Sequence, residues 1–253
     1  MKWINSTDLK NWASRRDSEE YLPLVIRRLI RATVNQIKSI SFPAGDSIVY
    51  PGWDGILESK EETEYIPRGL SLWELSTEKS IGEKAKRVYQ TRKENPLIPN
   101  PSEATFIFVT PRIWTKKDEW VEERKKEKFW NDVRVYDARD LEEWLEQVPA
   151  VGIWLSKHIG KYPQQNVQSL EGWWNEWSQV TRPPLTPELV LAGRKEQIER
   201  VKNWLNSESS LLKVQASTKD EALAFLSAVI LTLPEEEREY FLSKTIVVSD
   251  IEA

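Results

Sequence analysis

The chain has 253 residues, of which 40% are hydrophobic and 30% are charged, and its formal net charge is −4. This is the composition of a folded globular protein of one or two domains, with two favoured, and it excludes a disordered or membrane chain. The absence of cysteine excludes disulfides, thiolate catalysis and cysteine-ligated zinc, and a single histidine, His158, excludes most histidine chemistry. Any catalysis is therefore expected to use carboxylates, lysines, hydroxyl groups or a metal ion held by oxygen ligands.

The sequence predicts no membrane segment. No stretch has the roughly 18 apolar residues that a spanning helix requires, and the N-terminus has no apolar signal core. We therefore expect a cytoplasmic protein. Because the net charge is negative, a polyanion such as DNA would have to bind a local basic surface.

The first third of the chain predicts a helix, a loop and two strands. Apolar residues recur at helical spacing over residues 18–38, with Ser18 expected as the N-cap. Prolines and glycines then predict loop structure with a short strand over residues 42–55. Strands are expected near residues 55–58 and 70–76.

The middle of the chain alternates between helices and strands. A helix is expected over residues 81–93, and the apolar run of residues 105–112 is typical of a strand buried on both faces. A mixed-charge helix near 116–128, the strand 133–137 and the helix 138–147 follow. The alternation predicts an α/β or α+β sheet with helices packed on it.

Glu74 lies inside an otherwise apolar strand, where a buried carboxylate costs several kcal/mol unless it is neutralised, paired or bound to a cation. Antiparallel pairing of the two strands would bring it close to Asp54. Two carboxylates, with room left by Gly52 and Gly55, predict a site for Mg²⁺ or Mn²⁺. Such an ion can orient a water molecule and stabilise charge on a scissile phosphate.

The predicted helix beside this pair is basic. Over residues 79–93 the local charge is +5, because one acidic residue, Glu83, accompanies six basic ones: Lys79, Lys84, Lys86, Arg87, Arg92 and Lys93. A basic helix beside two acids suits a polyanionic substrate. The alternative is a solvated helix that only neutralises the two carboxylates.

An ordered series of segments carries a family resemblance. FPAGDS, PGWDG, GLSLWELST, KAKRVYQTRK, TFIFVTPRIWTKKDEWVEERK and WNDVRVYDARDLEEWLEQVPAV together cover about residues 1–160. The series resembles the N-terminal nuclease domain of bacterial antiphage proteins, in the Mrr-like branch of the restriction-endonuclease-like PD-(D/E)XK class. The resemblance implies a mixed central sheet flanked by helices, with Asp54 and Glu74 as the first and second metal-binding acids.

The chain departs from this family pattern at one position. The lysine expected two residues after Glu74 is replaced by Ser76. In several branches the following helix supplies the lysine, and by position Lys84 is the best candidate. Lys86 is the second choice because it points elsewhere on a helix, and Gln90 could join the face of Lys84.

Residues 161–253 lie outside the segments that carry this resemblance. Residues 161–190 are expected to form a helix and a linker, which contains Pro183, Pro184 and Pro187. Residues 191–253 resemble the start of a STAND-type NTPase domain, with a strand over residues 210–217, a helix and a second strand. We expect the chain to be a fragment whose C-terminal sensor or ATPase region is missing.

This NTPase-like segment lacks the phosphate-binding loop. The turn VQASTKDEALAF has no glycine, and Lys219 is not followed by serine or threonine. Backbone N–H groups need those glycines to approach phosphate closely, so ATP binding is not expected.

Two functions are consistent with the sequence. The first is a metal-dependent DNA endonuclease effector of antiphage defence, in which Asp54 and Glu74 hold the ion and Lys84 positions or activates the attacking water. The second is an inactive restriction-fold module for DNA binding or protein interaction. Asp46 could support the acidic cluster, or it could serve only as a turn residue or cap. The resemblance also implies that homo-oligomers could form.

Overall fold

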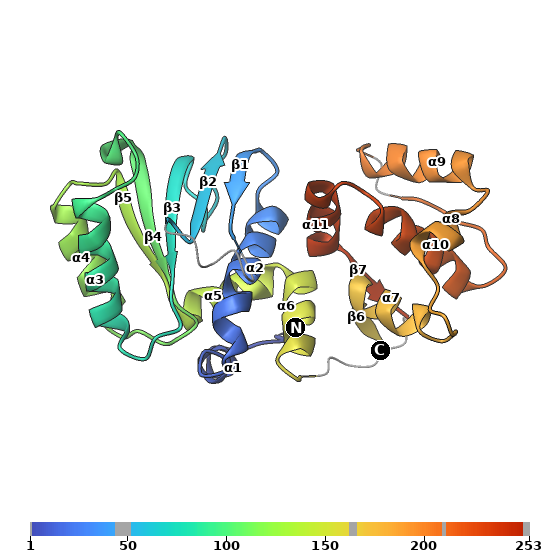
Figure 1. Ribbon diagram of the computed structural model, residues 1–253, viewed down its shortest axis with the longest axis horizontal. Coiled ribbons are helices and arrows are strands. Elements are labelled where there is room, and N and C mark those ends of the chain that lie inside the picture. Colours follow the sequence, from blue (N-terminus) through green and yellow to red (C-terminus); the bar gives the residue numbers. More distant parts are fainter. Residues whose placement is uncertain (1, 44–51, 162–165, 209–210, 250–253) are drawn as a thin grey trace. The chain divides into compact units, whose positions relative to one another are not determined.

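The computed structural model describes residues 2–43, 52–161, 166–208 and 211–249 (Figure 1). The chain divides into two compact units, Met1–Lys161 and Tyr162–Ala253. We call them unit 1 and unit 2 and describe each by itself.

Unit 1 is built on a five-stranded mixed sheet. The strands are β1 (Ile37–Ser41), β2 (Gly55–Ser59), β3 (Gly69–Leu75), β4 (Ala104–Val109) and β5 (Asp132–Tyr136), in the order β1-β2-β3-β4-β5. β1, β2 and β3 pair antiparallel, whereas β3, β4 and β5 pair parallel. The predicted α/β architecture, a mixed sheet flanked by helices, is therefore confirmed.

Helices cover both faces of this sheet (Figure 1). One apolar cluster packs four helices against one face, and a second cluster packs two helices against the other. The first group is α1 (Ser6–Trp12), α2 (Asp17–Thr33), α5 (Ala138–Gln147) and α6 (Pro149–His158). The second group is α3 (Ile81–Glu94) and α4 (Lys117–Lys126).

Alternation along β3 determines which way Glu74 points. Leu72 belongs to the cluster under α3 and α4, whereas Trp73 belongs to the cluster on the opposite face. Side chains two residues apart in a strand share a face, so Glu74 lies on the same side as Leu72. The buried carboxylate is thus directed to the side of the sheet that α3 covers.

The helix predicted over residues 18–38 is shorter than expected. α2 ends at Thr33, Val34 is extended, and β1 begins at Ile37. Ser18 is not the N-cap, because it is buried in the first turn and its hydroxyl donates to the carbonyl of Arg15. Pairing with β2 supplies Ile37–Ser41 with ladder hydrogen bonds, and this tertiary contact outweighs the helical periodicity of the sequence.

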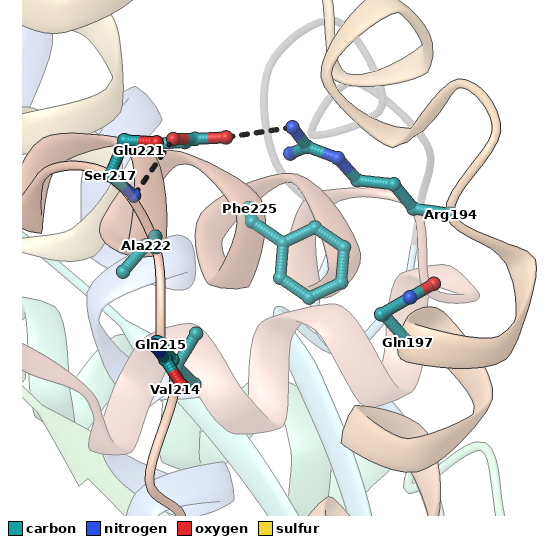
Figure 2. Close-up of a pocket in the computed structure, with 9 residues that line it drawn as sticks. Arg194, Gln197, Val214, Gln215, Ser217, Glu221, Ala222 and Phe225 are labelled. Atoms are coloured by element: carbon teal, nitrogen blue, oxygen red, sulfur yellow. Dashed lines mark hydrogen bonds and ion pairs between the residues drawn. The ribbon is translucent and has the colours of Figure 1, made fainter.

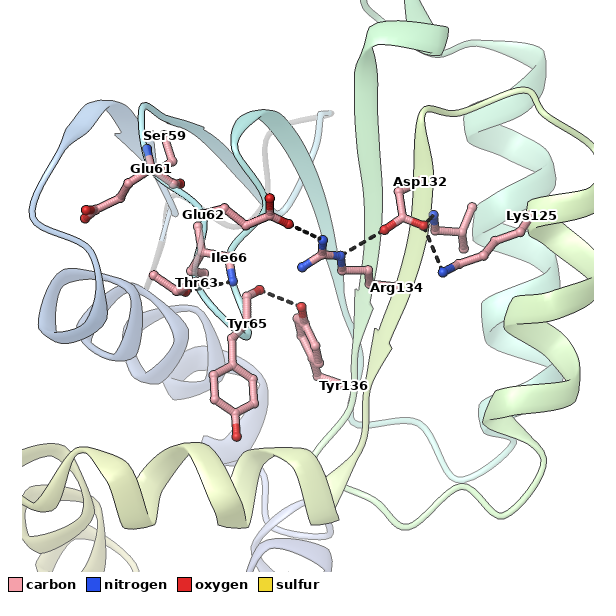
Figure 3. A network of polar contacts seen from close by, with 11 residues as sticks. Ser59, Glu61, Glu62, Thr63, Tyr65, Ile66, Lys125, Asp132, Arg134 and Tyr136 are labelled. Carbon is pink, nitrogen blue, oxygen red and sulfur yellow. Dashed lines mark hydrogen bonds and ion pairs between the residues drawn. The ribbon is translucent and has the colours of Figure 1, made fainter.

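An ion-pair network lies along β5, an edge strand of the sheet (Figure 3). Arg134 donates to Asp132 at 3.0 Å and to Glu62 at 3.2 Å, and Lys125 lies 3.0 Å from Asp132. Burial raises the pKa of Asp132, but the hydrogen bonds from Arg134 and Lys125 outweigh it and hold that pKa below its ordinary value. The network thus connects β5 to α4 and to the segment between β2 and β3.

Unit 2 is mostly helical. Its two short strands, β6 (Val167–Ser169) and β7 (Ile246–Val248), pair antiparallel. The helices are α7 (Leu170–Ser178), α8 (Pro187–Leu191), α9 (Lys195–Leu205), α10 (Lys219–Leu231) and α11 (Glu235–Lys244). In the part of the chain that the structure describes, no helix is both long and apolar enough to cross a bilayer.

Two predictions for unit 2 are wrong. The described part of the predicted strand, residues 211–217, has no strand structure, and Leu211 is 67% exposed. β7 pairs with β6 in a two-stranded sheet that does not include residues 211–217. The proline-rich segment expected as linker contains α8, because Pro187 occupies a first-turn position that favours a helix and Thr186 caps it.

Gly55 provides a test of the packing beside the sheet. A Cβ atom at this position would lie 2.1 Å from Cε1 of Phe42, which is buried against Trp73. We expect Gly55→Ala to lower the free energy of unfolding by about 1–3 kcal/mol, because the buried ring has no space to retreat. Urea denaturation measures this change.

Gly82→Ala is the matched control. A Cβ at Gly82 would lie 3.8 Å from Trp114, an ordinary contact, and the residue is in α3. This variant should be unchanged or stabilised by up to about 1 kcal/mol. Equal stability of the two variants would contradict the packing described here.

Candidate functional site

A cavity of about 270 Å³ opens at the carboxyl end of β3, where this strand meets α2 and the start of α3. Its lining is dominated by acids: four carboxylates and one lysine face or border it. The lining residues are Glu19, Leu22, Pro23, Asp54, Glu74, Leu75, Ser76, Thr77, Glu78 and Lys84. Such an excess of negative charge attracts cations.

Strand pairing places the first acid. Gly55 of β2 is opposite Trp73 of β3, so Asp54, which precedes β2, reaches the end of β3 beside Glu74. Oδ2 of Asp54 accepts a hydrogen bond from the backbone N–H of Leu75 at 2.7 Å. The structure therefore brings the two acids together by the antiparallel pairing that the sequence predicts.

Arg92 holds the second acid. Its Nε donates to Oε1 of Glu74 at 2.5 Å, and the two side chains are only 15% and 7% exposed. The same guanidinium group donates to the carbonyl of Gly52 and lies 4.5 Å from the ring centre of Trp53. Sequence reasoning counted Arg92 only as one of six basic residues and missed this contact, because a spacing of 18 residues carries no local signal.

Burial gives both carboxylates unusual proton affinities. Burial and, to a lesser extent, the charge of Asp54 raise the pKa of Glu74 to about 7, although Arg92 and Lys84 oppose the shift. Burial also raises the pKa of Asp54, against the Leu75 hydrogen bond and the same two cations. A divalent cation between the acids would relieve this repulsion and desolvation.

Each of the two carboxylates has one oxygen that could bind such an ion. Within the described residues, hydrogen bonds hold Oδ2 of Asp54 and Oε1 of Glu74 and leave the other oxygen of each carboxylate without a protein partner. The same residues contain no group of three or more histidine, aspartate or glutamate side chains arranged to hold a metal. Mg²⁺, which binds one or two carboxylates and keeps several waters, suits this pair of donors.

The two glycines differ in the space that they leave. Phe42 fills the space beside Gly55, so this glycine makes room for an aromatic ring and not for an ion. Gly52 has open space at its Cα, as the sequence predicts, and its carbonyl accepts from Arg92.

Lys84 borders the cavity and is fixed by Glu78. Its Nζ lies 3.0 Å from Oε1 of Glu78, which also accepts from Arg87. The backbone N–H of Glu78 donates to Oγ of Ser76 at 3.2 Å. Ser76, which stands where the family pattern has lysine, thus shapes the turn whose glutamate holds Lys84.

The supporting candidates do not join this group. Lys86 is exposed and does not border the cavity, and Gln90 donates to Glu94 at 2.9 Å on the exposed side of α3. Asp46 lies outside the described residues. Of the predicted site residues, the structure therefore gathers Asp54, Glu74 and Lys84.

The basic face predicted for α3 is largely neutralised. Four of the six basic side chains have carboxylate partners in the described residues: Lys84 and Arg87 pair with Glu78, Arg92 with Glu74 and Lys93 with Glu127. The local charge of +5 therefore overstates the attraction of this helix for DNA. The sequence count misses the acids that approach from other elements.

A second cavity, of about 270 Å³, lies in unit 2 beside the start of α10 (Figure 2). Arg194 and Glu221 form an ion pair of 2.8 Å there, and Glu221 also accepts from the N–H of Ser217. Thr218 caps α10 through the N–H of Glu221. Because the arginine is already paired, this cavity offers no extra positive charge to phosphate, and it carries no functional assignment.

Comparisons of the chain with protein-family models, curated proteins and solved structures found no match. The function is therefore argued from the geometry of the cavity in unit 1.

The pKa of Glu74 predicts a pH dependence. Its value of about 7 exceeds the ordinary 4.5, so folding favours the protonated form, and stability is lost as the pH rises through 7. Glu74→Gln removes this loss. In urea denaturation without metal, its stability relative to the native chain should rise by roughly 1–3 kcal/mol between pH 5 and pH 8.

Glu196→Gln serves as the control, because the Glu196 side chain is 75% exposed. Its difference from the native chain should stay constant over the same pH range. If the stability difference between Glu74→Gln and the native chain is also constant with pH, burial does not raise the pKa of Glu74.

Proposed function

We propose that unit 1 is a metal-dependent DNA endonuclease that hydrolyses phosphodiester bonds as an effector of bacterial antiphage defence. The observation that carries this proposal is the cavity in which Asp54 and Glu74 each keep one oxygen available beside Lys84. The ordered motifs of residues 1–160, which resemble Mrr-like nucleases, and the mixed sheet flanked by helices support it.

The two acids and the lysine of the cavity would have different roles in this reaction. Asp54 and Glu74 would hold Mg²⁺ or Mn²⁺, which when bound orients a water molecule and stabilises charge on the scissile phosphate. Lys84 carries a positive charge at the same cavity, and that charge acts on both acids. It can donate a hydrogen bond to the attacking water or to a phosphate oxygen.

The remaining exposed cations of this region lie next to the cavity in sequence. Lys79 precedes α3 and Lys86 lies on its exposed face, and neither has a carboxylate partner in the described residues. Both are available to a DNA backbone, which binds mainly through contacts of lysine and arginine with phosphate.

A second function, a non-catalytic restriction-fold module that binds DNA or protein, is favoured by one observation. Arg92 neutralises Glu74 and Glu78 holds Lys84, so two of the charged groups that the nuclease proposal uses already have oppositely charged partners within the protein. Ser76 in place of the family's lysine is consistent with this alternative.

A plasmid assay distinguishes the two functions. Purified protein incubated with supercoiled plasmid in Mg²⁺ or Mn²⁺ should nick or linearise it, whereas EDTA should prevent cleavage. Asp54→Asn keeps an oxygen acceptor for the Leu75 N–H but loses the charge, and it should reduce the cleavage rate at least 100-fold because the ion is bound more weakly. Absence of cleavage with either metal would support the binding module.

The two lysines of α3 form a matched pair of variants. Lys84 borders the cavity and Lys86 does not, so we expect Lys84→Ala to lower the cleavage rate about 100-fold or more. Lys86→Ala should change the rate less than threefold at saturating DNA. Equal losses in single-turnover rates would assign Lys84 to DNA binding and remove it from the chemistry.

A further inference from the structure

Arg92 is a largely buried cation of unit 1. It lies in the last turn of α3, and its side chain is only 15% exposed. Its Nε donates to Glu74, a terminal nitrogen donates to the Gly52 carbonyl, and the guanidinium plane lies over Trp53. The indole N–H of Trp53 in turn donates to the Pro96 carbonyl at 3.1 Å.

These contacts join three segments of the chain. They connect α3 to the end of β3, which carries Glu74, and to residues 52–53, which directly precede Asp54. One acid is therefore held through its own carboxylate and the other through the backbone before it. Arg92 therefore acts together with the β2–β3 pairing and the Leu75 N–H to fix the separation of the two acids.

We infer that Arg92 is a positioning residue for a divalent cation: it holds Oε1 of Glu74 so that the other oxygen, together with Asp54, faces the cavity. This inference rests on the proposed function, because it assumes that the two acids bind the ion. Arg92 does not itself contact the ion.

If Arg92 only neutralised the charge of Glu74, the site would not require an arginine. Any cation at this place would neutralise Glu74, and lysine would serve. Positioning needs the planar fork, because two donors of fixed direction must reach Glu74 and Gly52 together. Lysine is a single point charge on a flexible chain and cannot reproduce that geometry.

Arg92→Lys therefore separates the two roles, and its readout is Mn²⁺ affinity measured by calorimetric titration of the full chain. We expect the native protein to bind one Mn²⁺ that Asp54→Asn weakens strongly. Arg92→Lys should remain folded by circular dichroism and raise the Mn²⁺ Kd at least tenfold. The control is Arg200→Lys, at a helical arginine whose side chain is 77% exposed, and it should bind as the native chain does.

The outcomes are distinct. If the native chain binds no Mn²⁺, or if Asp54→Asn binds it equally well, the metal site fails and the proposed function fails with it. If Asp54→Asn weakens binding but Arg92→Lys binds like the native chain, the metal site stands and the positioning role is overturned.

A second variant covers the case in which Arg92→Lys does not fold. Arg92→Gln keeps a hydrogen-bond donor without the charge, and it should also raise the Kd at least tenfold. If both variants are unfolded while Asp54→Asn is folded, Arg92 is a structural residue and the inference is overturned.

Discussion

A carboxylate buried at the end of a sheet strand is the constraint on which unit 1 depends. Glu74 is 6% exposed, and alternation along β3 directs it to the side of the sheet opposite to that of Trp73. Burial of an unpaired charge costs several kcal/mol, so the fold has to supply a cation or keep the proton. Arg92 supplies the cation, and the raised pKa of Glu74 allows its carboxyl group to hold a proton near neutral pH.

The surroundings of this carboxylate follow from that requirement. Arg92 lies in the last turn of α3, and its guanidinium group packs over the ring of Trp53. Asp54 is then pinned by the N–H of Leu75, immediately after Glu74. The repulsion between the two acids remains, and it is the physical reason for expecting a divalent ion in the cavity.

Much of this architecture could be predicted from the sequence. The parts that could not be predicted have one cause in common. Periodicity and alternation indicate β2, β3, β4 and α3 because these patterns are local. The end of α2 at Thr33 and the lack of strand structure over residues 211–217 depend on which neighbours each segment finds. The approach of Asp54 to Glu74 was predictable because one hairpin joins them. The Arg92 contact was not, because only packing of α3 on the sheet creates it.

The pairing of Gly55 with Trp73 has a consequence for how the cavity is formed. A slip of one residue between β2 and β3 would exchange the faces of every β3 side chain. Trp73 would then project toward α3, and Glu74 would enter the apolar cluster beneath α2 and α5. The juxtaposition of Asp54 and Glu74 is thus tied to a single hydrogen-bond register, and any ligand that required both acids would bind only the correctly registered sheet.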